Sequence, residues 1–213
     1  MNFKEFAKVI ESFKNPVVLL EGSRNVLEED AESLINLANK LARKFPQAVF
    51  RSGAAIGSDD LFAQGVSQVS WERMQLVLPK SKSGFDKTNA VSFADLPDSE
   101  QEEIFTLTAE TTPKYKGLVD FYKKKQIGGT YYKTQFLLRD ALKVCGSKSF
   151  QMKRADVGCF YVNSNKAGGG GTGHDKSLQV AESSGNRANG LAEMALIAWE
   201  IYDDKRYRLT RLQ

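Results

Sequence analysis

Three short apolar runs, separated by two amphipathic stretches, constrain the fold of this chain more than any other feature. The runs cover residues 16–21, 48–51 and 74–78, and each is bounded by glycine, proline or a polar turn. Between them, residues 28–45 and 61–69 carry apolar side chains at spacings of three and four, the periodicity of one helix face. Because strands and helices that alternate in this way build right-handed parallel units, the sequence predicts an α/β fold. We expect a Rossmann-like, doubly wound, mainly parallel sheet with helices on both faces.

Residues from about 80 to 130 break this alternation. A polar loop is followed by two predicted helices, one beginning near Ser99 and one near Lys114. We interpret the segment as a helical insertion, comparable to a lid, because it is too small for a core of its own. The chain of 213 residues is therefore expected to form one domain, residues 1–213. The other predicted elements are a short amphipathic helix at the N-terminus, a helix over 130–144, a strand over 156–162 and a helix over 189–203.

The composition is that of a globular protein, with 41% hydrophobic and 26% charged residues. No apolar run approaches the roughly 20 residues of a membrane-spanning helix, and the N-terminus lacks the apolar segment of a signal peptide. Cys145 and Cys159 make no disulfide framework, and a single histidine predicts no zinc site. We therefore expect a cytoplasmic protein with no membrane partner, no metal and no cofactor. A formal net charge of +4 is too small to predict nucleic-acid binding.

Three of the predicted strands are followed by loops of small residues. In an open parallel sheet such loops share one edge, where ligands bind at the point where the strand order reverses. Glycine amides and helix N-termini bind anions, hydroxyls add donors, and arginine holds a phosphate through two hydrogen bonds. We therefore predict a phosphate-bearing, nucleotide-like ligand at this edge. The candidate binding residues are Gly22, Ser23 and Arg24 after the first strand, Ser52, Gly53, Gly57, Ser58 and Asp59 after the second, and Gly169, Gly170, Gly171, Thr172 and His174 after the fourth.

Two common nucleotide-binding motifs do not occur in the sequence. No Gly-x-Gly-x-x-Gly follows the first strand, and no Gly-Lys-Ser or Gly-Lys-Thr is present, which disfavours ordinary NAD dehydrogenases and P-loop ATPases. His174 has two interpretations, a phosphate ligand or an exposed loop residue. Tyr131 and Tyr132 also have two, since either ring can stack on a base or pack in the core.

Taken together, the loops resemble those of the SLOG superfamily, which joins the Smf/DprA DNA-processing proteins to the Lonely Guy (LOG) phosphoribohydrolases. The similarity covers residues 15–80 and 130–185. Its motifs are Gly22-Ser23-Arg24, Ser52-Gly53-x-x-x-Gly57-Ser58-Asp59, a third strand ended by Pro79, Arg139-Asp140 in a helix, Ala155-Asp156-Val157 at the start of strand four, and Gly169-Gly170-Gly171-Thr172.

This resemblance implies a Rossmann-like sheet whose glycine-rich loops bind a nucleotide or a nucleotide-derived ligand. It also implies self-association, so a homodimer is expected, and a role as a sensor in stress or phage defence. Strand one should lie between strands two and four. Arg139 should reach the pocket from the helix before strand four and meet the phosphate.

Two further functions follow from members of the same superfamily. LOG enzymes cleave nucleoside 5'-monophosphates and carry Pro-Gly-Gly-x-Gly-Thr-x-x-Glu, whereas this chain has Ala167 at the proline and Asp175 at the glutamate. Asp175 and Arg139 are therefore the catalytic candidates for a LOG-like hydrolase, although a helix N-cap also explains Asp175. DprA-type proteins bind single-stranded DNA with an Arg-Asn-Arg helix motif, and here Ala141 follows Arg139-Asp140. Nucleotide binding thus remains the leading hypothesis.

Overall fold

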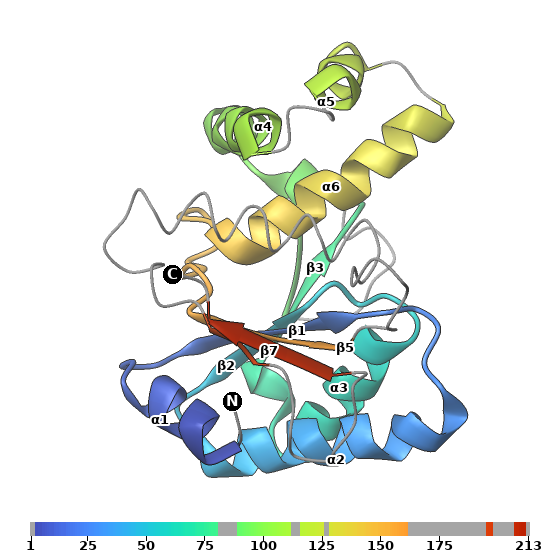
Figure 1. The fold of residues 1–213 in the computed structure, drawn as a ribbon. Helices are drawn as coiled ribbons and strands as arrows, with labels where there is room; N and C mark the ends of the chain where they lie inside the picture. Colours follow the sequence, from blue (N-terminus) through green and yellow to red (C-terminus); the bar gives the residue numbers. More distant parts are fainter. Residues whose placement is uncertain are drawn as a thin grey trace.

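The protein is organised around a single twisted sheet with helices on both faces (Figure 1). The computed structural model describes residues 3–80, 89–111, 116–125, 128–161, 195–197 and 207–211. Within these residues the sheet has seven strands in the order β4-β3-β2-β1-β5-β6-β7. The strands are β1 (Val17–Gly22), β2 (Val49–Ser52), β3 (Met74–Leu78), β4 (Ala90–Ser92), β5 (Val157–Tyr161), β6 (Ala195–Ile197) and β7 (Tyr207–Arg211).

The strand order confirms a doubly wound sheet. β1 pairs in parallel with β2 on one side and with β5 on the other, as the registers Val18↔Phe50 and Val18↔Val157 show. The pairings of β3 and β4 extend the sheet beyond β2, and β6 extends it beyond β5, all in parallel. The order therefore reverses between β1 and β5, which makes the carboxyl end of β1 the topological switch point. Only β7 runs antiparallel among the described strands.

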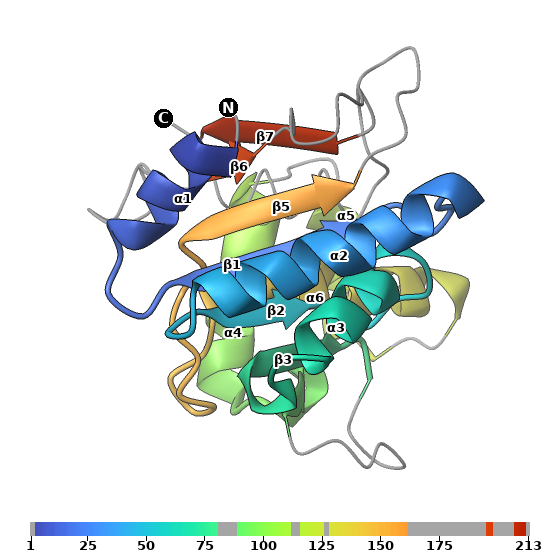
Figure 2. The same ribbon diagram turned by 90° about the horizontal axis from the view of Figure 1, so that it is seen from below.

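The helices form a layer on each face of the sheet (Figures 1 and 2). Helices α1, α2 and α3 cover one face, and α6 crosses the other with α4 and α5 stacked on its outer side. Two single 3-10 turns, η1 (Trp71–Arg73) and η2 (Phe93–Asp95), lead into or out of strands. The helices are α1 (Phe3–Glu11), α2 (Glu28–Lys44), α3 (Ser58–Ser67), α4 (Asp98–Thr111), α5 (Lys116–Lys123) and α6 (Gly129–Cys145).

The pair α2 and α3 shows how the sequence builds the lower layer. The predicted apolar face of α2 is the buried one, from Leu34 to Ala42, and acidic residues in its first turn and basic residues in its last turn complement the helix dipole. Gly65 lets α3 approach closely, because a Cβ at this position would lie 2.2 Å from the backbone oxygen of Ile35. The two helices therefore form a tight unit beneath β1 and β2.

The segment between β3 and α6 is only partly the helical insertion that the sequence predicts. Its two helices begin close to the predicted positions, at Asp98 and Lys116. Its start, however, contributes β4 to the sheet. Together with η2, the helices then bury aromatic rings against α6, and the ring centres of Phe93, Phe105 and Tyr122 lie 5.3–6.0 Å apart. The segment thus forms a packed outer layer over α6.

One predicted element is wrong. The helix expected over 189–203 is contradicted at Ala195–Ile197, which form β6 and pair with Val157–Cys159 of β5. A short apolar run has no periodicity that separates a strand from a helix, and here pairing with β5 decides the outcome. None of the helices in the described part of the chain is long and apolar enough to cross a bilayer.

Candidate ligand site at the carboxyl edge of the sheet

The loops after β1 and β2 contact each other and the end of β5. Ser23 N–H donates to the backbone oxygen of Tyr161 at 2.8 Å, and Ser58 N–H donates to the backbone oxygen of Ser23 at 3.1 Å. Gly57 has a positive φ of 99°, and a Cβ there would lie 2.4 Å from the Arg24 oxygen. Gly22 is packed as closely, with a Cβ position 2.1 Å from the Tyr161 oxygen. Both glycines are therefore needed for the loops to meet at the switch point.

Helix α6 forms a wall along the same edge. The guanidinium groups of Arg24 and Arg139 both lie 5.3 Å from the ring centre of Phe136. One turn earlier in the helix, the ammonium group of Lys80, from the segment after β3, lies 5.1 Å from the ring centre of Tyr132. Arg24 and Lys80 are exposed, and Tyr132 is 44% exposed. The rim of the site therefore combines cations from two strand-end loops with two aromatic rings from α6.

The amides of the β2–α3 loop are already occupied by a side chain. The Oδ2 atom of Asp59 accepts hydrogen bonds from the N–H of Gly53 at 3.2 Å and the N–H of Ala55 at 3.4 Å. A Cβ added to Gly53 would lie 2.8 Å from Arg139 Cζ and 2.9 Å from Asp59 Oδ2. The space beside the Gly53 Cα is thus flanked by a cation and a carboxylate, and the amide of this buried residue is not presented to solvent.

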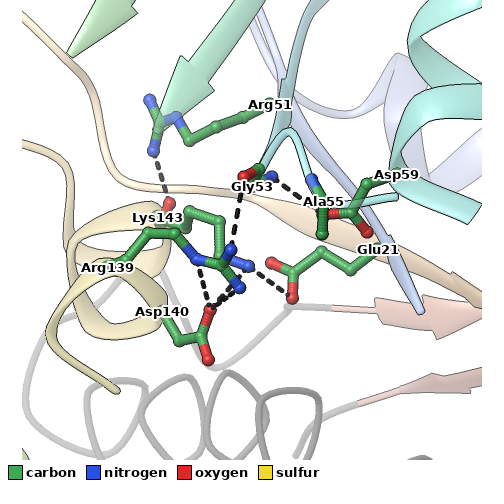
Figure 3. A network of polar contacts seen from close by, with 8 residues as sticks. All are labelled: Glu21, Arg51, Gly53, Ala55, Asp59, Arg139, Asp140 and Lys143. Carbon is green, nitrogen blue, oxygen red and sulfur yellow. Dashed lines mark hydrogen bonds and ion pairs between the residues drawn. The ribbon is translucent and has the colours of Figure 1, made fainter. Parts of the chain in front are cut away.

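Beneath the rim lies a buried network of charges (Figure 3). The ammonium group of Lys143 contacts Glu21 Oε2 at 2.9 Å and Asp140 Oδ1 at 2.8 Å. Arg139 donates from Nη2 to Asp140 Oδ1 at 2.9 Å and from Nη1 to the Gly53 oxygen at 3.3 Å. These charged residues, together with Asp59, are at most 6% exposed. The network ties α6 to the ends of β1 and β2.

The electrostatics of this network follow from its composition of three carboxylates and two cations. Burial raises the pKa of Glu21, and the nearby Asp140 and Asp59 add to this, while Lys143 opposes it. Burial alone would lower the pKa of Lys143, but Asp140 and Glu21 more than offset it, so the pKa is raised. Arg139 behaves in the same way. The cluster therefore contains one more carboxylate than cations.

A third buried cation, Arg51 of β2, holds the sheet and helix α6 together. Its guanidinium is fully buried and donates to the backbone oxygen of Lys143 at 2.6 Å and of Lys153 at 2.7 Å, and to Gln75 Oε1 at 2.8 Å. Burial lowers the pKa of Arg51 to about 10, and the field of Asp156 partly opposes this. The guanidinium therefore stays charged at neutral pH and fastens the last turn of α6 to the sheet.

The structure brings together every predicted binding residue in the described part of the chain. The residues at this edge are Gly22, Ser23, Arg24, Ser52, Gly53, Gly57, Ser58 and Asp59, with Arg139 reaching them from α6. As expected, Arg139 comes to the carboxyl ends of the strands, and β1 lies between β2 and β5. Outside the described residues lie Gly169, Gly170, Gly171, Thr172, His174 and the catalytic candidate Asp175.

Other functional candidates were missed by the sequence reasoning. Lys80, Phe136, Asp140, Lys143 and Glu21 line the rim or the network, and none was proposed for the site. The signal lay in α6, where positions 132, 136, 139 and 143 are spaced by four, three and four and therefore share one helix face. The structure also distinguishes the two interpretations of Tyr131 and Tyr132, core packing and an exposed position at the rim. Tyr131 stacks on Tyr122 at 4.5 Å, whereas Tyr132 stands exposed at the rim.

Comparisons of the chain with protein-family models, with curated proteins and with solved structures give no match.

Proposed function

We propose that this protein binds a nucleotide or a nucleotide-derived, phosphate-bearing ligand at the carboxyl edge of its sheet, and that it acts as a sensor. The observation that carries the proposal is the rim formed by α6 and the strand-end loops. Tyr132 and Phe136 are one helical turn apart, and each faces an exposed cation, Lys80 and Arg24 respectively. Aromatic rings stack on bases, and lysine and arginine pair with phosphate oxygens.

The position of the rim supports the same function. Arg24 follows β1 directly, and β1 is the strand at which the order of the sheet reverses. Ligands of open α/β sheets bind in the crevice beside such a strand. The exposed side chain of Ile56, at 85%, adds an apolar surface from the neighbouring loop. A base resting on apolar and aromatic side chains would place its phosphate among the cations of the rim.

The contacts of Arg139 favour binding over catalysis. The guanidinium is held by Asp140 and by the Gly53 oxygen, and the side chain is 7% exposed. Because its guanidinium is engaged in this way, Arg139 is suited to support the β2–α3 loop and the Phe136 ring, and is less suited to contact a reacting phosphate. We therefore propose a binding site in preference to a LOG-like hydrolase, whose other candidate is Asp175.

The proposal is tested by binding measurements with a panel of nucleotides. In a panel of mono-, di- and cyclic nucleotides and NAD derivatives, the ligands that bind should raise the melting temperature, because binding to the folded state stabilises it, and the corresponding nucleosides should raise it less. For the best ligand, Arg24→Ala and Phe136→Leu should each weaken binding about tenfold, the scale of one charge-assisted contact. Lys133→Ala, an exposed lysine on the same helix, is the matched control and should bind as the wild type does.

Two results would count against this proposal. One is the absence of any thermal shift across the panel at millimolar concentration. The other is binding that is equally strong in Arg24→Ala, Phe136→Leu and Lys133→Ala, since the ligand would then occupy another surface.

A further inference from the structure

The β2–α3 loop contains an anion position that the protein fills by itself. The N–H groups of Gly53 and Ala55 converge on one oxygen, Asp59 Oδ2, which is the way backbone amides hold a phosphate oxygen. Asp59 is the second residue of α3, so the helix dipole favours a negative charge at this point. The guanidinium of Arg139 lies close to the same place, since a Cβ at Gly53 would be 2.8 Å from Arg139 Cζ and 2.9 Å from Asp59 Oδ2. The Asp59 carboxylate therefore has the surroundings that a bound anion would have.

The loop also offers more polar groups than Asp59 uses. The hydroxyls of Ser52 and Ser58, at the two ends of this loop, are fully buried, and neither has a hydrogen-bond partner among the described residues. A buried hydroxyl without a partner is costly, so such groups mark a place where a ligand or water is bound. The nearby carboxylates do not form a metal site, because the described residues contain no group of three side chains that could hold a metal ion.

The sign of the charge changes from the rim to the interior of the site. At the rim, Arg24 and Lys80 are exposed cations. In the interior, Glu21, Asp59 and Asp140 outnumber Arg139 and Lys143. One phosphate is attracted to the rim, whereas a second anionic group reaching inward would meet the carboxylate of Asp59 in the position it needs. Like charges at such short range repel each other strongly, and this repulsion disfavours entry.

From these three observations we infer that Asp59 is a specificity-determining residue: its carboxylate fills the inner anion position and excludes ligands that carry a second negative group there. The inference rests on the proposed function and adds to it. The site then accepts a ligand with one phosphate at the rim and discriminates against adjacent phosphates. Replacing the carboxylate by a neutral amide should remove the repulsion of a second anionic group, while the backbone amides, Arg139 and the two serine hydroxyls remain.

The test compares inorganic phosphate with pyrophosphate as probes on the full chain. The wild type should bind pyrophosphate no more tightly than phosphate in calorimetric or phosphorus NMR titrations. Asp59→Asn should bind pyrophosphate at least about tenfold more tightly than the wild type, so that the ratio of the two affinities rises. Asp60→Asn is the matched control, because Asp60 is the next residue, is exposed, and bonds only Gln64 among the described contacts. Its ratio should stay at the wild-type value.

The outcomes separate this inference from the proposed function. An unchanged ratio in a folded Asp59→Asn protein, in a wild type that still binds nucleotides, overturns the inference alone. Pyrophosphate binding at least tenfold tighter than phosphate in the wild type also overturns it. If neither probe nor any nucleotide binds the wild type, both proposals fall. Should Asp59→Asn not fold, as judged by circular dichroism, Asp59→Ser provides the same comparison with a smaller neutral side chain.

Discussion

Replacement of Lys143 by methionine should destabilise the protein strongly, because it removes the cation between two buried carboxylates. The ammonium group lies 2.9 Å from Glu21 and 2.8 Å from Asp140, and the side chain is 1% exposed. Methionine has a similar length and fills the space, so the loss is chiefly electrostatic. Removing one partner of a buried ion pair costs about 3–5 kcal/mol. For a chain of 213 residues, with ~2–4 °C lost per kcal/mol, the melting temperature should fall by roughly 10 °C.

The matched control is an exposed lysine with an equally short ion pair. Lys123 contacts Glu102 at 2.6 Å, but the two side chains are 40% and 57% exposed. Lys123→Met should therefore cost less than about 1 kcal/mol. Urea unfolding followed by circular dichroism measures the free energy of unfolding of both variants in the same way. Adding Glu21→Gln to Lys143→Met should recover part of the loss, because it removes one of the two uncompensated carboxylates. If Lys143→Met is no more destabilised than Lys123→Met, the network does not hold α6 to the sheet.

Three further predictions concern pH and packing. Burial raises the pKa of Glu21 above 4.5, so the folded state binds an extra proton, and stability from this group should be full below pH 4.5 and fall as the pH rises towards the folded pKa. Glu21→Gln should remove this decline in urea unfolding measured across the acid-to-neutral range, and a parallel decline in both proteins would contradict the assignment. Gly65→Ala should cost ~1–3 kcal/mol, because its Cβ would meet the Ile35 oxygen at 2.2 Å, and thermal unfolding unchanged from the wild type would refute this contact. Arg51→Met should lower the free energy of unfolding by ~3 kcal/mol or more, because the backbone oxygens of Lys143 and Lys153 lose their donor. Arg43→Met, at an exposed position of α2, should be near neutral in the same assay.

The sheet was predictable because its strands are buried on both faces. An apolar run such as residues 74–78 matches β3 residue for residue, and Pro79 and Gly22 mark the strand ends as expected. The same reasoning located the loops, since parallel strands must open their carboxyl ends on one edge. β6 was not predicted because Ala195–Ile197 is a strand through its pairings with β5 and β7, which are contacts that the local sequence pattern does not show.

The buried charges could not be found in this way. Charged residues are mostly exposed, so a sequence offers no reason to bury Glu21 or Lys143 until the partner is known. Glu21 and Lys143 are more than 100 positions apart in the sequence, and only the fold brings the end of β1 beneath α6. Arg139 and Asp59 were assigned to the ligand from their loops and motif. The structure places both in contacts with the protein itself, and these contacts distinguish the inner position, which Asp59 fills, from the proposed outer binding surface.

Helix α6 joins these two parts of the site. Its first half carries the rings of Tyr132 and Phe136 to the rim, and its second half carries Arg139, Asp140 and Lys143 into the network. Arg139 belongs to both, because its guanidinium packs on Phe136 while it bonds the Gly53 oxygen. A ligand that presses on the Phe136 ring therefore acts on the residue that holds the β2–α3 loop. Since that loop also carries Asp59, Arg139 connects the rim of the proposed site to the inner carboxylate through contacts with Phe136 and Gly53.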